Sequence, residues 1–186
     1  MRADARRNYD RLLEAAQQAV DERGIDASLD DIAKRAGVGS GTLYRHFPSR
    51  MALMEAVFLS RIEDLSVRTH KLAADAEPQE ALEAWLVDML RYITRNRGLG
   101  ATLKNALDSD GQFMERCHQL MRDSADAVVG RAQRAGVLRP DVTSTDLMRL
   151  VGGVAQATDV LPDRDAQARR LLDVVINGLR VRPFTA

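Results

Sequence analysis

The sequence predicts an all-α protein. Ala, Leu, Arg, Glu, Asp and Gln dominate its 186 residues, and aromatic residues make up only 4%. Runs of Val, Ile and Thr that alternate with polar residues, as expected of strands, are missing. Apolar residues instead recur at helical spacing, first at Tyr9, Leu12, Leu13, Ala16 and Val20. We therefore expect helices and no sheet.

Composition narrows the class of protein further. The chain begins Met-Arg-Ala-Asp-Ala-Arg-Arg and contains no long apolar stretch, so we expect neither a signal peptide nor a membrane span and a cytoplasmic location. The single cysteine, Cys117, excludes an internal disulfide and a cysteine-rich zinc site, and we expect no metal or other cofactor. The formal net charge is +0, so overall charge does not indicate a nucleic-acid partner. Residues 36–50, however, contain two arginines and no acidic residue.

Nine helices are expected, separated by caps, glycines and prolines. The first helix ends at Gly24, the second runs from a capping-box pattern at Ser28 and Asp31 to Gly37, and the third ends near Phe47. The fourth helix begins after Pro48 with Ser49 as its cap, the fifth runs from Pro78 to Asn96-Arg97-Gly98, and the sixth runs from about Leu99 to Leu107. The seventh helix runs from Phe113 to Gly136, and the last two helices lie on either side of Pro162.

Residues 28–50 have the pattern of a helix-turn-helix. Ala33 is small where two crossed helices would touch, and Gly37 lies in the turn between them. Apolar contacts between the two helices would come from Ile32, Val38, Leu43 and Phe47. The second helix would expose Ser40, Gly41, Thr42, Tyr44, Arg45 and His46. Such a face, without acidic residues, suits a DNA major groove.

These residues resemble the DNA-binding signature of the TetR family of bacterial transcriptional regulators. The similarity covers Gly37-Val38 and Gly41-Thr42-Leu43-Tyr44-Arg45-His46-Phe47-Pro48-Ser49-Arg50, and Gly136-Val137-Leu138-Arg139-Pro140-Asp141 is similar to a connector between later helices of that family. Gly39 departs from the pattern, because the family more often has Ser, Thr or Ala there, which leaves the helix cap to the backbone or to Ser40.

The resemblance implies both a domain organisation and a function. Residues 1–48 would form the DNA-binding domain, and residues 49–186 would form a helical ligand-binding and dimerisation domain. The implied protein is a homodimeric, ligand-responsive regulator and not an enzyme. It would most commonly be a repressor, released from palindromic operator DNA when a small molecule binds the larger domain.

The resemblance also implies DNA-contacting residues. Ser40, Gly41, Tyr44 and Arg45 would face base edges, while Ser28, Thr42, Tyr44, His46 and Arg50 would meet phosphates. Arg45 can donate two hydrogen bonds to O6 and N7 of guanine. The alternatives are a solvated Arg45, a core position for the Tyr44 ring and simple exposure of His46. Arg2, Arg6 and Arg7 would either reach DNA or belong to a disordered terminus.

A ligand cavity is expected among the helices that follow the motif. Its candidate lining residues are bulky, polarisable or polar: Trp85, Met89, Tyr92, Phe113, Met114, Cys117, His118 and Met121. The alternative is an ordinary core stripe. Cys117 could also act as a redox switch, but its position on this stripe favours an inert buried thiol.

The last two helices have apolar faces larger than one partner helix would cover. A dimer interface would use Leu147, Leu150, Val151, Val154, Leu171, Leu172, Val175 and Leu179. Gly152-Gly153 would let another backbone approach closely. The alternative is that these helices pack only on their own chain.

Two other classes of function are compatible with a helical chain of this kind. Glu115-x-x-His118 has the spacing of helical di-iron sites, but such sites need that motif twice, and the chain has only three histidines. No Ser-His-Asp order, glycine-rich phosphate loop or His-Glu-x-x-His motif supports catalysis either. A helical module that binds protein instead of DNA is the remaining alternative.

Overall fold

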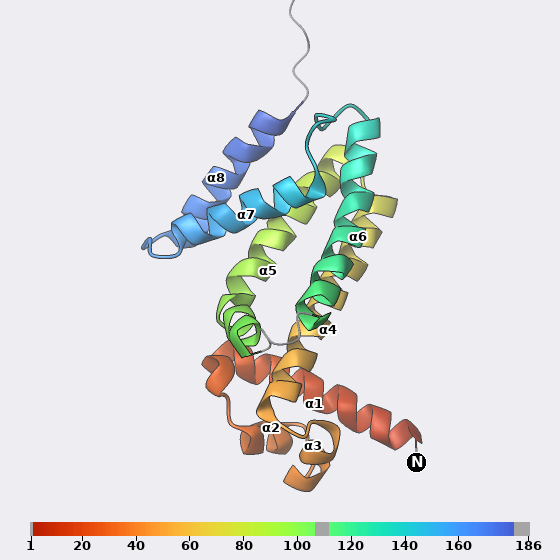
Figure 1. Ribbon diagram of the computed structural model, residues 1–186, viewed down its shortest axis with the longest axis vertical. Helices are drawn as coiled ribbons and strands as arrows, with labels where there is room; N and C mark the ends of the chain where they lie inside the picture. The colour runs from red at the N-terminus through yellow and green to blue at the C-terminus, as the bar shows by residue number, and fades with distance from the viewer. Residues whose placement is uncertain (1, 107–111, 181–186) are drawn as a thin grey trace, which may run out of the picture. The chain divides into compact units, whose positions relative to one another are not determined.

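The computed structural model describes residues 2–106 and 112–180, and this part of the chain is helical (Figure 1). Its elements are α1 (Arg2–Arg23), the short 3-10 helix η1 (Gly24–Asp26), α2 (Leu29–Arg35), α3 (Ser40–His46), α4 (Arg50–Asp75), α5 (Pro78–Ala106), α6 (Gln112–Arg134), α7 (Ser144–Thr158) and α8 (Arg164–Leu179). The all-α prediction is confirmed: the described residues form no strand, only an isolated bridge between Leu138 and Arg180. None of their helices is both long and apolar enough to cross a membrane.

The count of nine helices was wrong, because the expected fifth and sixth helices are one continuous helix, α5. Asn96 does not end the helix: its side chain is buried and accepts a hydrogen bond from Arg61 Nη1 at 2.7 Å. Gly98 keeps helical backbone, and the buried stripe continues through Leu99 and Leu103. A helical glycine costs only about 1 kcal/mol relative to alanine, which such packing offsets. Leu107 and the expected turn at 108–111 lie outside the described residues.

The other helix boundaries follow their expected signals. Gly24, Gly37 and Gly136 have φ of 69°, 64° and 71°, a left-handed conformation that ends helices and that other residues adopt only with strain. Ser28 caps α2 by accepting from the Asp31 N–H at 3.3 Å, and Ser49 accepts from the Ala52 N–H at 3.1 Å. A full capping box between Thr143 and Asp146 begins α7.

The N-terminal arginines lie in α1, so residues 2–23 form a helix and not a disordered terminus. Arg6 pairs with Asp10, with Nε 3.2 Å from Oδ1, and Arg7 pairs with Asp4. Both pairs join residues one helical turn apart, and pairs of this kind favour the helix.

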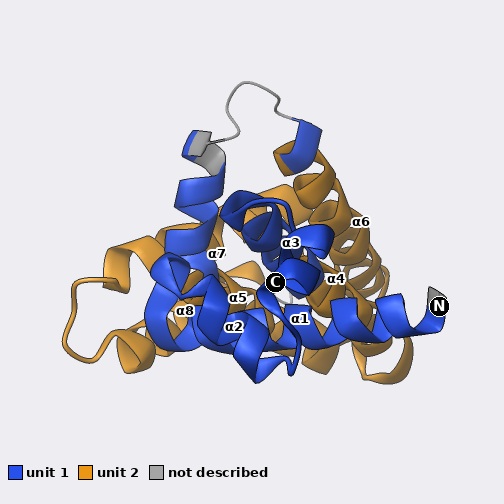
Figure 2. Cartoon of the chain, turned by 90° about the horizontal axis from the view of Figure 1, so that it is seen from below, with its two compact units in different colours: residues 1–61, 96–113 blue, residues 62–95, 114–186 orange. Residues whose placement is uncertain are grey.

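The chain forms two compact units, coloured separately in Figure 2. The first comprises residues 1–61 and 96–113, and the second comprises residues 62–95 and 114–186. In the first unit α1 contacts α2, which contacts α3, and the buried core includes Leu12, Ile32 and Leu43. In the second unit α5, α6, α7 and α8 share an apolar cluster that includes Trp85 and Val128.

Replacing Gly98 by alanine tests the continuity of α5. A Cβ at this position would meet no atom within 4 Å, and the backbone is already helical. We expect Gly98→Ala to raise the free energy of unfolding by about 0.5–1 kcal/mol, because alanine has the higher helix propensity. Urea denaturation at fixed protein concentration measures the change.

Gly136→Ala is the matched control. Its Cβ also meets no atom within 4 Å, but φ is +71°, so we expect a loss of roughly 1–2 kcal/mol from backbone strain alone. A loss of the same size for Gly98→Ala would contradict a continuous α5.

Candidate functional site

The candidate site is built on α3, a helix of seven residues. It begins at Gly39, whose carbonyl oxygen accepts from the N–H groups of Thr42 (2.9 Å) and Leu43 (3.2 Å). No side chain caps it at Gly39, as the sequence suggested, and the Ser40 hydroxyl donates instead to Asp30 Oδ1 on α2 at 3.1 Å. Helices this short are not stable alone, so α3 depends on its packing.

The inner face of α3 supplies that packing. Leu43 is 1% exposed, and Phe47, which ends the helix, is 3% exposed. The ring of Tyr9 on α1 lies 5.1 Å from the Phe47 ring and meets the His46 ring edge-on at 6.1 Å. The sequence placed Tyr9 on the buried stripe of the first helix but gave no sign that its partners would be α3 residues.

The outer face of α3 is open to solvent. Ser40, Gly41 and Arg45 are exposed, and Tyr44 is 49% exposed, so its ring is not a core ring. Thr42 and His46 are half-buried at the edge of this face. The arrangement therefore presents a hydroxyl, a phenol and a guanidinium together on one short rigid helix.

Ion pairs hold α2 in place against α1. Both guanidinium nitrogens Nη1 and Nη2 of Arg35 donate to the Glu22 carboxylate, at 2.8 and 2.5 Å. These hydrogen bonds, followed by the attraction of the charge, hold the pKa of Glu22 below its ordinary value. Arg23 Nη1 donates to Asp31 Oδ2 at 2.7 Å. These contacts orient the helix on which α3 rests.

Two of the expected phosphate-contacting residues have structural partners. The Ser28 hydroxyl oxygen is the cap of α2. Arg50, the first residue of α4, donates through Nη1 to the carbonyl oxygens of Ile25 (3.1 Å) and Ala27 (2.5 Å). Arg50 thus connects the start of α4 to the loop before α2 by hydrogen bonds. Its position in the sequence motif did not suggest this role.

Four of the eight expected ligand residues line one pocket in the second unit. Met89, Tyr92, His118 and Met121 surround a space of about 370 Å³, together with Ile93, Arg122, Thr145, Met148 and Arg149. Thr145, Met148 and Arg149 come from α7. Met148 and Arg149 follow Thr145 by three and four residues, and this spacing was the overlooked signal that one face of the helix belongs to the pocket.

The other four expected ligand residues lie elsewhere. Trp85 and Cys117 are fully buried, and Met114 is half-buried and does not line this pocket. Phe113 belongs to the first unit, where its ring lies 6.3 Å from that of Phe58. Burial raises the pKa of the Cys117 thiol to about 11, so almost no reactive thiolate exists near neutral pH.

The expected dimer residues divide into two groups. Leu147, Val151 and Leu172 are fully buried in their own chain, and Val154 is 9% exposed. Leu150 is 42% exposed, and Leu171, Val175 and Leu179 are half-buried.

An open groove of about 610 Å³ runs over the outer surface of α7 and α8. It is lined by Asp146, Arg149, Leu150, Gly153, Val154, Ala157, Leu171, Val174 and Val175. Val174, 65% exposed, was missed, although it lies one helical turn after Leu171. A Cβ on Gly152 or Gly153 would meet no atom within 4 Å, so their surface is open to another backbone.

The described residues offer no metal site. Within 2–106 and 112–180, no three His, Cys, Asp or Glu side chains are grouped so that they could hold a metal ion. Glu115, from the Glu-x-x-His pattern, instead accepts a hydrogen bond from Arg122 at 2.6 Å.

Comparison with known proteins agrees with the geometry of both units. Residues 12–57 match the family model for bacterial regulatory proteins of the tetR family, and residues 77–181 match the model for the C-terminal domain of SbtR-like transcriptional regulators. The HTH-type transcriptional regulator UidR of Escherichia coli K12 is 29% identical over 204 residues, with 96% of each chain covered.

Solved structures give the same result. A TetR transcriptional regulator from Streptomyces coelicolor is 39% identical and superposes with a TM-score of 0.79, covering 94% of this chain and 99% of its own. A TetR regulatory protein from Mycobacterium vanbaalenii is 31% identical with a TM-score of 0.70, covering 97% and 99%. The helix-turn-helix, the eight α-helices of the described residues and these matches agree, and the chain belongs to the TetR family of DNA-binding transcriptional regulators.

Proposed function

We propose that the protein is a homodimeric, ligand-responsive repressor that acts in the cytoplasm without catalysing a reaction. Residues 1–48, together with Arg50 just after them, bind operator DNA, and residues 49–186 form the dimer and receive a small-molecule effector. The observation that carries the proposal is the exposed outer face of α3, with Tyr44 and Arg45 open to solvent and Leu43 holding the helix from behind.

In this proposal α3 enters the major groove. Ser40, Gly41, Tyr44 and Arg45 contact base edges, and the Arg45 guanidinium donates to O6 and N7 of a guanine. Ser28, Thr42, His46 and Arg50 contact phosphates, which set the position of the helix on the duplex. Arg50 uses Nη1 for the carbonyl groups of Ile25 and Ala27, so a phosphate would be met by its remaining N–H groups.

The dimer forms through the groove on α7 and α8. Leu150, Leu171, Val174 and Val175 present an apolar surface, and the open backbone at Gly153 allows a helix of a second copy to pack closely. Two copies related by a two-fold axis would place their α3 helices in successive major grooves, about 34–36 Å apart. The operator is therefore a near-palindrome.

The effector occupies the pocket lined by Met89, Tyr92, His118 and Met121. The methionines and Tyr92 give the pocket a largely apolar, adaptable lining, and His118, Thr145 and Arg149 offer hydrogen bonds at its polar positions. A largely apolar molecule with one polar group fits this lining. Helix α4 belongs to the first unit over residues 50–61 and to the second over 62–75, so it joins the unit that contains the motif to the unit that contains the pocket. An effector that binds more tightly to a dimer with another separation of the two α3 helices weakens DNA binding. The loss equals the difference between the effector's affinities for the two forms of the dimer.

Selection of bound fragments from random duplex DNA is expected to yield a near-palindrome with half-sites one helical turn apart. Arg45→Ala should then lose about 1–3 kcal/mol of discrimination at one base pair of each half-site, because the bidentate guanine contact is gone. Competition binding with operators changed at single base pairs measures this loss. Wild-type specificity in the variant would contradict the assignment of α3.

Two further variants separate base contacts from phosphate contacts. Arg50→Ala should weaken binding to all sequences alike and lower the slope of log K against log salt by about 1. Arg134→Ala, which removes a charge from the end of α6, should change neither affinity nor specificity. An unchanged salt slope in Arg50→Ala would assign Arg50 to loop positioning alone.

Val174→Glu is expected to convert the dimer to a monomer, because a carboxylate would be buried unpaired in the interface. Val67→Glu is the matched control: Val67 is 69% exposed and Val174 is 65% exposed, but Val67 lies on α4. Analytical ultracentrifugation reports the mass, and circular dichroism checks helicity. A dimeric Val174→Glu would place the interface elsewhere.

Met148→Trp is expected to fill the effector pocket. A thermal-shift screen of largely apolar small molecules should give compounds that stabilise the wild-type protein and release the operator, and the variant should lose both responses while still binding operator. Met114→Trp, on α6 outside this pocket, should keep them. If Met148→Trp responds as the wild type does, the effector site lies elsewhere.

A further inference from the structure

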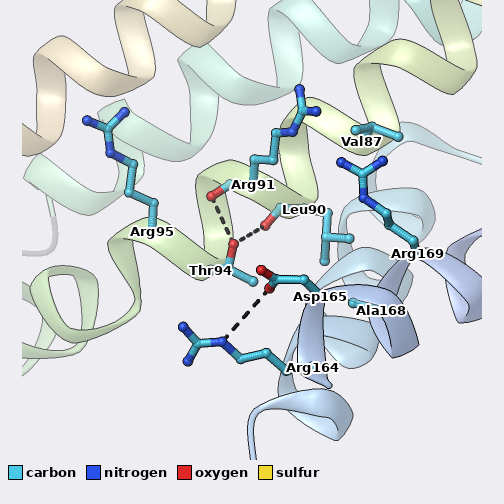
Figure 3. A pocket seen from close by; sticks show the side chains of 9 residues that line it. All are labelled: Val87, Leu90, Arg91, Thr94, Arg95, Arg164, Asp165, Ala168 and Arg169. Carbon is cyan, nitrogen blue, oxygen red and sulfur yellow. Dashed lines mark hydrogen bonds and ion pairs between the residues drawn. The ribbon is translucent and has the colours of Figure 1, made fainter. Parts of the chain in front are cut away.

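The pocket between α5 and the beginning of α8 is lined by arginines that do not converge (Figure 3). Figure 3 shows their side chains spread apart around a space of about 490 Å³. Arg91 pairs with Asp88, with Nη1 3.3 Å from Oδ1. Arg164 pairs with Asp165, with Nε 3.8 Å from Oδ1. In the first unit, in contrast, two polar side chains meet at the edge of the outer face of α3.

The fold brings a carboxylate to this face. Residues 36–50 contain no acidic residue, but Asp30, in the first turn of α2, accepts through Oδ1 from the hydroxyl group of Ser40 at 3.1 Å. Ser40 is the first residue of α3, and both side chains are exposed. The next carboxylate, that of Asp31, is used differently, because it accepts from Arg23 Nη1 at 2.7 Å. Asp30 therefore adds an acceptor beside the surface that α3 exposes.

The turn between α2 and α3 holds the two residues at this distance. Gly37 has φ of 64°, and the Val38 N–H donates to the carbonyl oxygen of Ala33 at 3.0 Å. This bond closes the turn directly after α2. The backbone that carries Asp30 and Ser40 is thus fixed before DNA binds.

The hydrogen bond determines what the Ser40 oxygen can offer to a base. A hydroxyl group has one hydrogen and can otherwise donate or accept, so serine alone tolerates either kind of base edge. A carboxylate only accepts, so the Ser40 hydrogen is donated to Asp30 and the Ser40 oxygen can only accept from a base.

Of the four bases, cytosine best matches such an acceptor. In the major groove cytosine presents the N4 amino group and no acceptor. Adenine has the acceptor N7 beside its amino group, guanine presents N7 and O6, and thymine presents O4. The negative charge of Asp30 would repel each of these acceptors.

We propose that Asp30 is a positioning residue that makes Ser40 select cytosine in each half of the operator. The inference rests on the proposed function, in which α3 enters the major groove and Ser40 faces a base edge. Entry into the groove removes water that competes for the hydrogen bond between Asp30 and Ser40, and this strengthens the bond. Ser40 and Arg45 are separated by about 7.5 Å along the helix axis, so they read different base pairs.

Competition binding to the selected operator tests the proposal. The relevant base pair is the one whose preference is lost in Ser40→Ala, and wild-type selection should give cytosine there. Thymine in its place should weaken wild-type binding about tenfold. In Asp30→Ala the same change should cost no more than about twofold, because the freed hydroxyl group can donate to O4 of thymine. Adding Asp30→Ala to Ser40→Ala should change the preference no further, since Asp30 acts through Ser40.

Asp26→Ala is the matched control for charge. Asp26 is exposed on η1, and the single hydroxyl hydrogen of Ser40 is donated to Asp30 and not to it. Asp26→Ala should therefore keep the wild-type preference for cytosine, and circular dichroism checks the helicity of every variant.

Three results would overturn the proposal: another base at this position, a preference kept in Asp30→Ala, or a further loss when Asp30→Ala is added to Ser40→Ala. None of them touches the proposed function, because the wild-type chain would still select an operator that Arg45 reads. Selection of no operator by the wild-type chain would overturn both.

Discussion

One buried guanidinium, that of Arg61 on α4, fixes how three helices of the first unit meet. Its side chain is 5% exposed and donates to Asn96 Oδ1 on α5 (2.7 Å), and to the Gln17 carbonyl oxygen (2.9 Å) and Asp21 Oδ1 (2.8 Å) on α1. A charge removed from water is costly unless its hydrogen bonds are satisfied, and breaking such a pair costs about 3–5 kcal/mol. A movement of α1 against α4 or α5 that broke these contacts would carry this cost.

The position of α3 depends on this constraint through α1. Tyr9, on the same helix as Gln17 and Asp21, packs on Phe47 and His46 at the end of α3. A seven-residue helix has no stability of its own, so its inner residues must bury apolar surface against neighbours. Because Leu43 and Phe47 supply this burial, the side chains of Tyr44 and Arg45 on the outer face are not needed for packing and stay open to solvent.

Helix boundaries that depend on neighbouring residues were predicted correctly from the sequence. A boundary that depends on a residue far away in the chain was not. The caps at Ser28 and Ser49 and the stops at Gly24, Gly37 and Gly136 depend on neighbouring residues, and the structure has them. The expected stop at Asn96-Arg97-Gly98 was wrong because Asn96 is satisfied by Arg61, 35 residues away in the chain. The helix-turn-helix was recognisable because all of its parts lie within one short segment.

The pocket and the groove on α7 and α8 were harder to predict because three faces of α7 have different surroundings. Leu147 and Val151 enter the core, Thr145 and Met148 line the pocket that Met89 also lines, and Leu150 and Gly153 line the outer groove. An apolar stripe shows that a helix is buried but not which neighbour covers each side, so the sequence assigned all four apolar residues Leu147, Leu150, Val151 and Val154 to one dimer interface. Arg149 lines both the pocket and the groove. In the proposed mechanism an effector that displaces Arg149 would therefore alter the dimer surface directly, without any change having to pass through the core between them.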